Sequence, residues 1–277
     1  MESPHGAALS AEGFGLKGPR GWAFRGVEFT AGPGSLVAVE GPSGSGRTCL
    51  LLALTGRMRS TTGHAEVGGE RLPGRLAAVR GFSALGPVPG VSELDPSLTV
   101  AEHLRERALL ARRFDGSLRS LLRRRPGRAA TARAAVGTAL DAAGLDLADL
   151  PKAGRTSVRD LERLEALRLS VALALMSRPR LLAVDDTDLK LSAADRALAW
   201  ELLRSLAAGG TTVLAVCSEA PKDALTVRTR PAAGPDTPAD GTTTGDTPTA
   251  GTPADDTTTD TTTGKGTADA IAETGRA

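Results

Sequence analysis

The sequence lacks several residue types, and each absence narrows what the protein can be. It contains no tyrosine, two cysteines and three histidines. Cys49 and Cys217 lie far apart in the chain, so they form none of the close spacings that metal and redox sites use. We therefore expect neither a disulfide framework nor a zinc site, but two reduced thiols in a cytosolic protein.

Asparagine and glutamine are also absent, and isoleucine occurs once, at Ile271. No stretch approaches the roughly 20 apolar residues that a membrane-spanning helix needs. The longest apolar helical candidate, Leu167 to Met176, is far shorter. The segment from Met1 to Gly6 lacks the basic and apolar regions of a secretory signal. With a net charge of +2 and 24% charged residues, the composition predicts a soluble globular protein and names no partner.

The composition changes near Arg230, where large apolar residues almost disappear. Residues 230–277 consist mainly of Thr, Asp, Pro, Gly and Ala, and such a segment cannot bury enough surface to offset its ordering entropy. We therefore predict one folded domain over residues 1–229 and a disordered tail over residues 230–277.

Strand and helix patterns alternate along residues 1–229. The strand candidates are Ala7–Gly15, Gly21–Thr30, Leu36–Glu40, His64–Leu72, Arg75–Leu85, Leu181–Asp185, Thr211–Val216 and Ala224–Thr229. The helix candidates are Cys49–Met58, the block from Thr99 to about Gly144 with a break near Arg125–Gly127, Leu161–Ser177 and Ala193–Ala208. Apolar strands that are each followed by a helix predict an α/β domain with a mainly parallel sheet. The helical block of about residues 99–160 is expected to be an inserted subdomain, and the first strands an antiparallel portion.

A glycine-rich loop follows the apolar strand Leu36–Glu40 and precedes a helix. Its residues are Gly41, Pro42, Ser43, Gly44, Ser45, Gly46, Arg47 and Thr48. Glycines let such a loop turn tightly and direct its N–H groups at phosphates, while the next helix points its positive end at them. The pattern predicts a binding site for a nucleoside triphosphate. Arg47 stands where a lysine is usual, and an arginine is a planar fork on a longer stem.

A second element completes the predicted site. The apolar strand that begins at Leu181 ends in Asp185, which is expected to bind Mg²⁺ together with the hydroxyl of Thr48. Asp186 follows, at the position of a carboxylate that would activate water. A strand that ends in two acidic residues can also be an ordinary turn, but the preceding phosphate loop favours the metal site.

These motifs, in this chain order, resemble the ATP-binding subunits of ABC transporters from about Leu9 to Thr229. The similar segments are Gly32–Gly41, Thr61–Gly69, Leu94–Leu104 and Ser177–Leu182. The resemblance implies a P-loop NTPase fold, ATP and Mg²⁺ as ligands, a transmembrane transporter subunit and a second ATP-binding subunit as partners, and a place at the inner face of the cell membrane.

The sequence departs from the family pattern at its hydrolytic positions. The stretch Ala84–Gly90 contains no glutamine, and Leu161–Glu165 replaces the glycine-rich signature. The remaining departures are Asp186 for the usual glutamate, Ser192 for an aspartate, Ser218 for the switch histidine and Gly18 near the position of the adenine-stacking aromatic, for which Trp22 is a possible substitute. We expect nucleotide binding to be retained better than hydrolysis.

Three functions stay open at this point. The first is an ATP-binding transporter subunit with weak or partner-dependent hydrolysis, as a homodimer or paired with an intact subunit. The second is a regulator or scaffold that binds nucleotide without hydrolysing it. The third is nucleic-acid binding through a basic block, which is disfavoured because few aromatic residues accompany the arginines. A solvated helix face is the simpler interpretation, followed by contact with the anionic membrane leaflet or with a coupling segment of a membrane partner. The block comprises Arg105, Arg107, Arg112, Arg113, Arg119, Arg123, Arg124, Arg125, Arg128 and Arg133.

Overall fold

A computed structural model describes residues 5–114, 125–188 and 190–229, without the side chains of residues 111–129. The chain divides into two units, Met1–Asp236 and Thr237–Ala277. All features below belong to the first unit. The predicted disorder of residues 230–277 lies outside the described residues.

The N-terminal part forms an antiparallel sheet of four strands. Its strands are β1 (Leu9–Gly18), β2 (Gly21–Ala31), β4 (Thr62–Val67) and β5 (Glu70–Leu72), in the order β2-β1-β4-β5. The predicted strand His64–Leu72 is therefore two strands. Gly68 and Gly69, with φ of 58° and 89°, form the turn between them, since this left-handed backbone favours glycine.

A second sheet of five strands is parallel throughout, which confirms the predicted α/β class. Its strands are β6 (Ser83–Leu85), β7 (Leu181–Val184), β8 (Thr212–Cys217), β3 (Leu36–Glu40) and β9 (Leu225–Arg228), in the order β6-β7-β8-β3-β9. Every neighbouring pair in this order is parallel. The carboxyl ends of all five strands therefore meet at one edge of the sheet.

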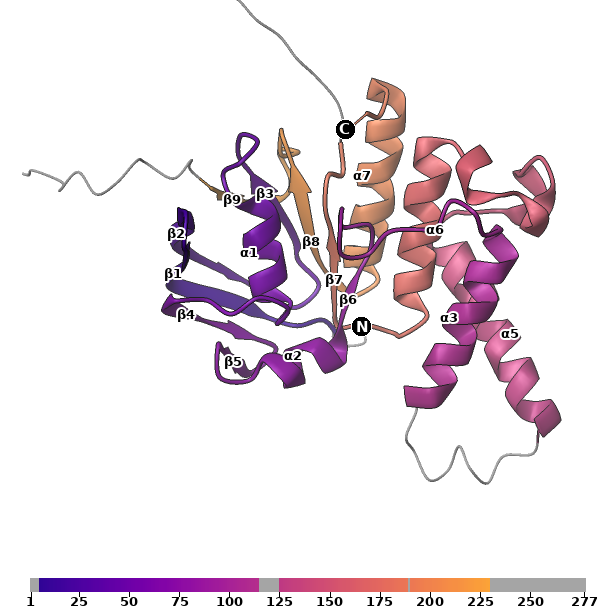
Figure 1. The fold of residues 1–277 in the computed structure, drawn as a ribbon, viewed down its shortest axis with the longest axis horizontal. Helices are drawn as coiled ribbons and strands as arrows, with labels where there is room; N and C mark the ends of the chain where they lie inside the picture. The colour runs from indigo at the N-terminus through magenta and orange to yellow at the C-terminus, as the bar shows by residue number, and fades with distance from the viewer. Residues whose placement is uncertain (1–4, 115–124, 189, 230–277) are drawn as a thin grey trace, which may run out of the picture. The chain divides into compact units, whose positions relative to one another are not determined.

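Both faces of the parallel sheet are buried, as expected for central strands that consist almost entirely of apolar residues. In β7, Leu182 and Val184 join one core cluster, while Leu181 and Ala183 join the other. Helix α1 (Arg47–Leu54) packs with the second cluster, next to the antiparallel sheet. Helices α6 (Arg163–Leu175) and α7 (Ala193–Ala208) pack with the first cluster, so the sheet lies between α1 and α7 (Figure 1).

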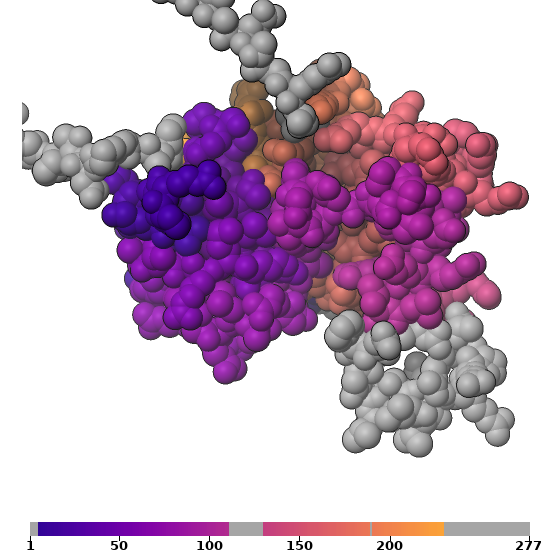
Figure 2. Space-filling model, in the orientation of Figure 1, coloured from indigo at the N-terminus to yellow at the C-terminus, as the bar shows by residue number. Residues whose placement is uncertain are grey.

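A helical segment extends beyond α6 on the side away from the antiparallel sheet (Figure 1). Helices α3 (Val100–Phe114) and α5 (Arg125–Ala142) pack against each other and against α6. Three short 3₁₀ helices then lead to α6. These helices confirm the inserted helical subdomain. In the space-filling view, the magenta segment that includes α3 and the violet segment that precedes it in the chain lie on the same face of the molecule (Figure 2).

The predicted strand Arg75–Leu85 is wrong over most of its length. Residues Leu76–Phe82 form helix α2, and only Ser83–Leu85 form a strand. A Cβ on Gly56 would lie 2.5 Å from the Leu76 carbonyl oxygen and 3.2 Å from Val79 Cβ. The turn after α1 therefore packs directly on α2. Leu76, Ala77, Ala78 and Arg80 have high helix propensity, and the packing on Gly56 adds to this local preference.

Two predicted elements have the bounds that the structure shows. Strand β3 and helix α7 coincide with their predictions residue for residue. The predicted break near Arg125–Gly127 is the start of α5, where Pro126 lies in the first turn and costs no intrahelical hydrogen bond. In the described part of the chain, no helix combines the length and apolar character that crossing a membrane requires.

Candidate phosphate-binding site

The glycine-rich loop connects the carboxyl end of β3 to the start of α1. Gly44 and Gly46 have φ of 79° and 82°. A Cβ on Gly46 would lie 1.9 Å from the carbonyl oxygen of Ala23 on β2, so no side chain fits there. The loop borders a cavity of about 620 Å³ whose lining residues are Glu40, Gly41, Pro42, Ser43, Arg47, Asp186 and Ser218.

Helix α1 begins at Arg47, and the first N–H groups of a helix have no intrahelical acceptor. These groups and the positive end of the helix dipole attract anions. The first intrahelical bond runs from the Leu50 N–H to the Gly46 carbonyl, 2.8 Å. Of the predicted phosphate residues, Gly41 to Gly46 therefore lie between a strand end and a helix start, and Arg47 and Thr48 open the helix, the arrangement that the motif requires.

Thr48 and Asp185, the two predicted metal ligands, are in direct contact. The Thr48 hydroxyl donates to Asp185 Oδ2 at 2.7 Å, and the Asp186 N–H donates to Oδ1 at 2.9 Å. Asp185 is 2% exposed, and burial raises the pKa of its carboxyl while the Thr48 hydrogen bond opposes the shift. A buried carboxylate and a hydroxyl beside a phosphate loop fit Mg²⁺, which takes one or two protein oxygens and completes its shell with phosphates and water.

Asp186, the predicted catalytic carboxylate, lines the same cavity. Its φ is 48°, a left-handed conformation that aspartate tolerates better than most residues. The backbone here favours an aspartate at this position. Its role in catalysis stays a prediction.

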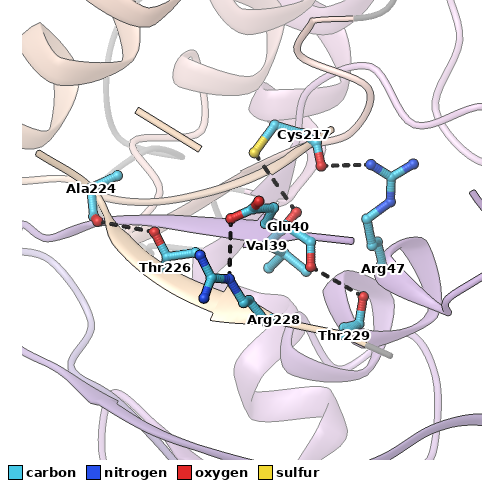
Figure 3. A network of polar contacts seen from close by, with 8 residues as sticks. All are labelled: Val39, Glu40, Arg47, Cys217, Ala224, Thr226, Arg228 and Thr229. Atoms are coloured by element: carbon cyan, nitrogen blue, oxygen red, sulfur yellow. Dashed lines mark hydrogen bonds and ion pairs between the residues drawn. The ribbon is translucent and has the colours of Figure 1, made fainter. Parts of the chain in front are cut away.

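Arg47 does not extend freely into the cavity. Its Nη1 donates to the carbonyl oxygen of Cys217, at the end of β8, at 2.6 Å (Figure 3). The guanidinium that would bind phosphate is thus already paired with a backbone acceptor. Sequence reasoning missed this contact because 170 residues separate the two positions.

Ser218, at the position of the switch histidine, is also paired. Its N–H donates to Asp188 Oδ2 at 2.8 Å, and its hydroxyl donates to the same oxygen. Asp188 is 9% exposed, and the sequence analysis did not identify it. No local pattern could have shown that it faces the end of β8.

The replaced signature lies at the start of α6. The Glu162 N–H donates to Glu165 Oε2 at 2.8 Å, so a carboxylate of the protein already accepts a hydrogen bond from the backbone at this helix start. A helix start with two acidic side chains repels a phosphate.

Two other positions that depart from the family pattern also have defined contacts. The stretch without glutamine, Ala84–Gly90, runs beside β7, with the Asp185 N–H donating to the Pro87 carbonyl at 3.0 Å. Ser192 caps α7 by accepting from the Asp195 N–H at 3.1 Å.

Trp22, the suggested adenine-stacking residue, lies next to Ala23, whose carbonyl contacts the phosphate loop. Lys17 Nζ lies 5.5 Å from the centre of the Trp22 ring. The ring therefore carries a cation–π contact in this structure. Its role toward a base stays a prediction.

Both cysteines are free thiols. Burial raises the pKa of Cys49, and it raises the pKa of Cys217 to about 12. Both groups are therefore neutral near pH 7 and act as small apolar side chains.

A second cavity of about 490 Å³ lies between the core and the helical segment, among α2, β6, α3 and α6. Arg57, Arg80 and Arg107 line it, and each donates to a backbone carbonyl group. Of these three, only Arg107 belongs to the basic block. Arg105 and Arg133, the other members of the block whose side chains are described, are exposed. The rest of the block, Arg112 to Arg128, lies outside the described side chains.

Known proteins resemble this chain in sequence. The family model described as ABC transporter matches residues 24–188. A Nod factor export ATP-binding protein I from Ralstonia nicotianae is 31% identical over 206 residues. That match covers 74% of this chain and 58% of the relative, so the chain spans little more than half of the relative's length.

Solved structures share the fold. A bacterial ABC transporter cassette, solved as a dimer, has a TM-score of 0.62 at 19% identity and covers 81% of this chain and 95% of its own. An ATP-binding cassette bound to ADP and Pi has a TM-score of 0.58 at 20% identity, with coverage of 76% and 88%. Together with the match to the family model, the shared strand, loop and helix order shows that this chain belongs to the ABC transporter family.

Proposed function

We propose that this chain is the ATP-binding subunit of an ABC-type membrane transporter. It binds Mg-ATP through residues 41–48, and its hydrolysis of ATP is weak or depends on a partner. The observation that carries the proposal is the hydrogen bond between Thr48 and Asp185 beside the cavity that Arg47 and Asp186 line. A bound Mg²⁺ would neutralise phosphate charge, while Thr48 and Asp185 position it.

Three features support weak hydrolysis. The side chain of Asp186 is one methylene shorter than the usual glutamate. Ser218 is hydrogen-bonded to Asp188, so its hydroxyl is not free to contact a phosphate. The start of α6 carries Glu162 and Glu165, and acidic groups there would oppose the phosphates of a nucleotide bound to a second subunit.

The proposal includes two partners. A transmembrane subunit would dock at the cavity between α2 and α3, where Arg57, Arg80 and Arg107 present positive charge. A second ATP-binding subunit would complete the nucleotide site, either as a homodimer or, with better hydrolysis, as a heterodimer with an intact subunit. The chain would then lie in the cytoplasm, at the inner face of the cell membrane. Within the chain, residues 1–229 would form the ATP-binding domain and residues 230–277 a tail.

A regulator or scaffold that binds nucleotide without hydrolysing it is the second candidate. The contact between Arg47 and the Cys217 carbonyl favours it, because that contact competes with the γ-phosphate for the guanidinium. Association with a membrane protein separates the two functions. Co-purification with a multi-span membrane subunit would support the transporter, and a chain that binds nucleotide but no membrane subunit would support the regulator.

ATP turnover by the purified chain tests the hydrolytic part. With Mg²⁺ present, we expect phosphate release close to that of protein-free buffer, and little change in Asp186→Asn. Asp141→Asn, an exposed carboxylate on α5, is the matched control. Vigorous Mg²⁺-dependent turnover that disappears in Asp186→Asn but not in Asp141→Asn would contradict weak hydrolysis.

A further inference from the structure

Strand β9 lies beside the strand that enters the phosphate loop. It pairs in parallel with β3, and Glu40 opposite Arg228 is the last pair in the register. The Thr229 N–H then donates to the Glu40 carbonyl at 2.9 Å. The Thr229 hydroxyl also donates to this carbonyl at 3.4 Å, and Arg228 Nε lies 3.5 Å from Glu40 Oε2 (Figure 3). Thr229 is thereby placed next to Gly41, the first residue of the loop.

The Thr229 side chain reaches into the loop itself. Its Oγ1 lies 2.7 Å from Ser45 Oγ, although 184 residues separate the two positions. Ser45 is 0% and Thr229 5% exposed, and Ser45 is the only buried residue between Gly41 and Thr48. A buried hydroxyl that loses its partner costs free energy, so this hydrogen bond restrains the buried Ser45 side chain in the middle of the loop.

Gly41 packs directly against the hydroxyl groups of Ser45 and Thr229. A Cβ at this position would lie 2.5 Å from Thr229 Oγ1 and 2.6 Å from Ser45 Oγ, so the hydroxyl pair fills the space where a side chain would be. The glycines on both sides of Ser45 have wide backbone freedom, which must be lost before the loop can bind phosphate. A restraint from outside the loop reduces the loss that accompanies binding.

We propose that Thr229 is a positioning residue for the phosphate loop. Its hydroxyl keeps Ser45, and with it the N–H groups of residues 41–48, in the arrangement that binds the phosphates of a nucleotide. Thr229 acts through Ser45 and contacts no phosphate itself. The proposal rests on the proposed function for the identity of the ligand, but the restraint on the loop is a property of the free protein.

The test compares Thr229→Val, which removes the hydroxyl at similar size, with Thr229→Ser, which keeps it. Thr226→Val is the matched control, since Thr226 lies on β9, the strand that leads to Thr229, and is exposed. Amide hydrogen exchange of a peptide that covers residues 41–48 is measured without nucleotide, and the Kd of Mg-ATP by calorimetry. In Thr229→Val we expect faster exchange of the loop and about tenfold weaker binding, a factor that corresponds to about 1.4 kcal/mol.

Thr229→Ser and Thr226→Val are expected to match the unaltered protein. Combining Thr229→Val with Ser45→Ala should add little to either single effect, because both changes remove the same hydrogen bond. If Thr229→Val lowers only the Tm and changes neither exchange nor Kd, Thr229 is purely structural and the proposal is wrong. If the unaltered chain binds no nucleotide, the proposed function fails, and the exchange data alone decide whether Thr229 restrains the loop. Thr229→Ala replaces Thr229→Val if the latter does not fold.

Discussion

The contact between Arg47 and Cys217 leads to a prediction about nucleotide affinity. The Arg47 guanidinium donates to the Cys217 carbonyl at 2.6 Å, and a hydrogen bond that involves a charged group contributes about 1.5–3 kcal/mol. Arg47 is half-buried, so solvent screens the contact and the lower end of this range applies. The other N–H groups of Arg47 stay available, but the bond to Cys217 fixes the direction of the guanidinium, so a phosphate that needs Nη1 or another direction must replace this contact.

Arg47→Lys removes the guanidinium and introduces a compact ammonium that phosphate loops ordinarily use. If breaking the Cys217 contact costs about 1.4 kcal/mol, the variant should bind Mg-ATP about tenfold more tightly. Calorimetric titration measures the Kd of Mg-ATP. Arg204→Lys is the control, because Arg204 lies on α7 and forms an exposed ion pair with Asp223. Unchanged or weaker binding in Arg47→Lys would refute the reasoning, since it would mean that Arg47 already binds phosphate productively.

Two further predictions concern the loop and the metal ligand. Gly46→Ala should abolish nucleotide binding, because its Cβ would lie 1.9 Å from the Ala23 carbonyl oxygen. Gly26→Ala is the control, since its backbone strain at φ of 60° is similar but its Cβ would meet open space, and it should bind normally. Equal binding by both variants in a fluorescent ATP titration would contradict the packing argument. Burial raises the pKa of Asp185, so the carboxyl binds a proton more tightly in the folded state than in the unfolded state. The protonated carboxyl therefore contributes to the free energy of unfolding below the ordinary pKa of about 3.9, and this contribution is lost as the pH rises through the raised pKa. Asp185→Asn should therefore raise the Tm of the nucleotide-free protein at neutral pH, lose this advantage near pH 4, and lose the stabilisation by Mg-ATP. Since about 1 kcal/mol moves the Tm of such a domain by roughly 2–4 °C, a thermal scan across pH resolves the effect, and a lower Tm at neutral pH would contradict it.

Local patterns were sufficient for the elements that surround the phosphate loop. The apolar run Leu36–Glu40 and the Gly209–Gly210 stop after α7 are strong short-range signals, and both boundaries agree with the structure. The contact between Thr48 and Asp185 was also predictable, because a phosphate loop and a strand end in a parallel sheet meet at the same edge.

The rest depends on contacts that no local pattern contains. Helix α2 is an exception, since Leu76, Ala77, Ala78 and Arg80 have high helix propensity and local reasoning could have identified it. The contacts of Arg47 with Cys217 and of Ser45 with Thr229 join residues that are 170 and 184 positions apart. Each depends on β8 and β9 lying on either side of β3, an order that only the folded sheet reveals.

The central claim is that residues 41–48, with Thr48 and Asp185, bind Mg-ATP. The most direct measurement is a calorimetric titration of the full chain with ATP, performed once with Mg²⁺ and once with a chelator. We expect saturable binding to one site per chain with Mg²⁺ and clearly weaker binding without it. Absence of binding under both conditions would contradict the claim and would leave the ABC-type fold without its ligand.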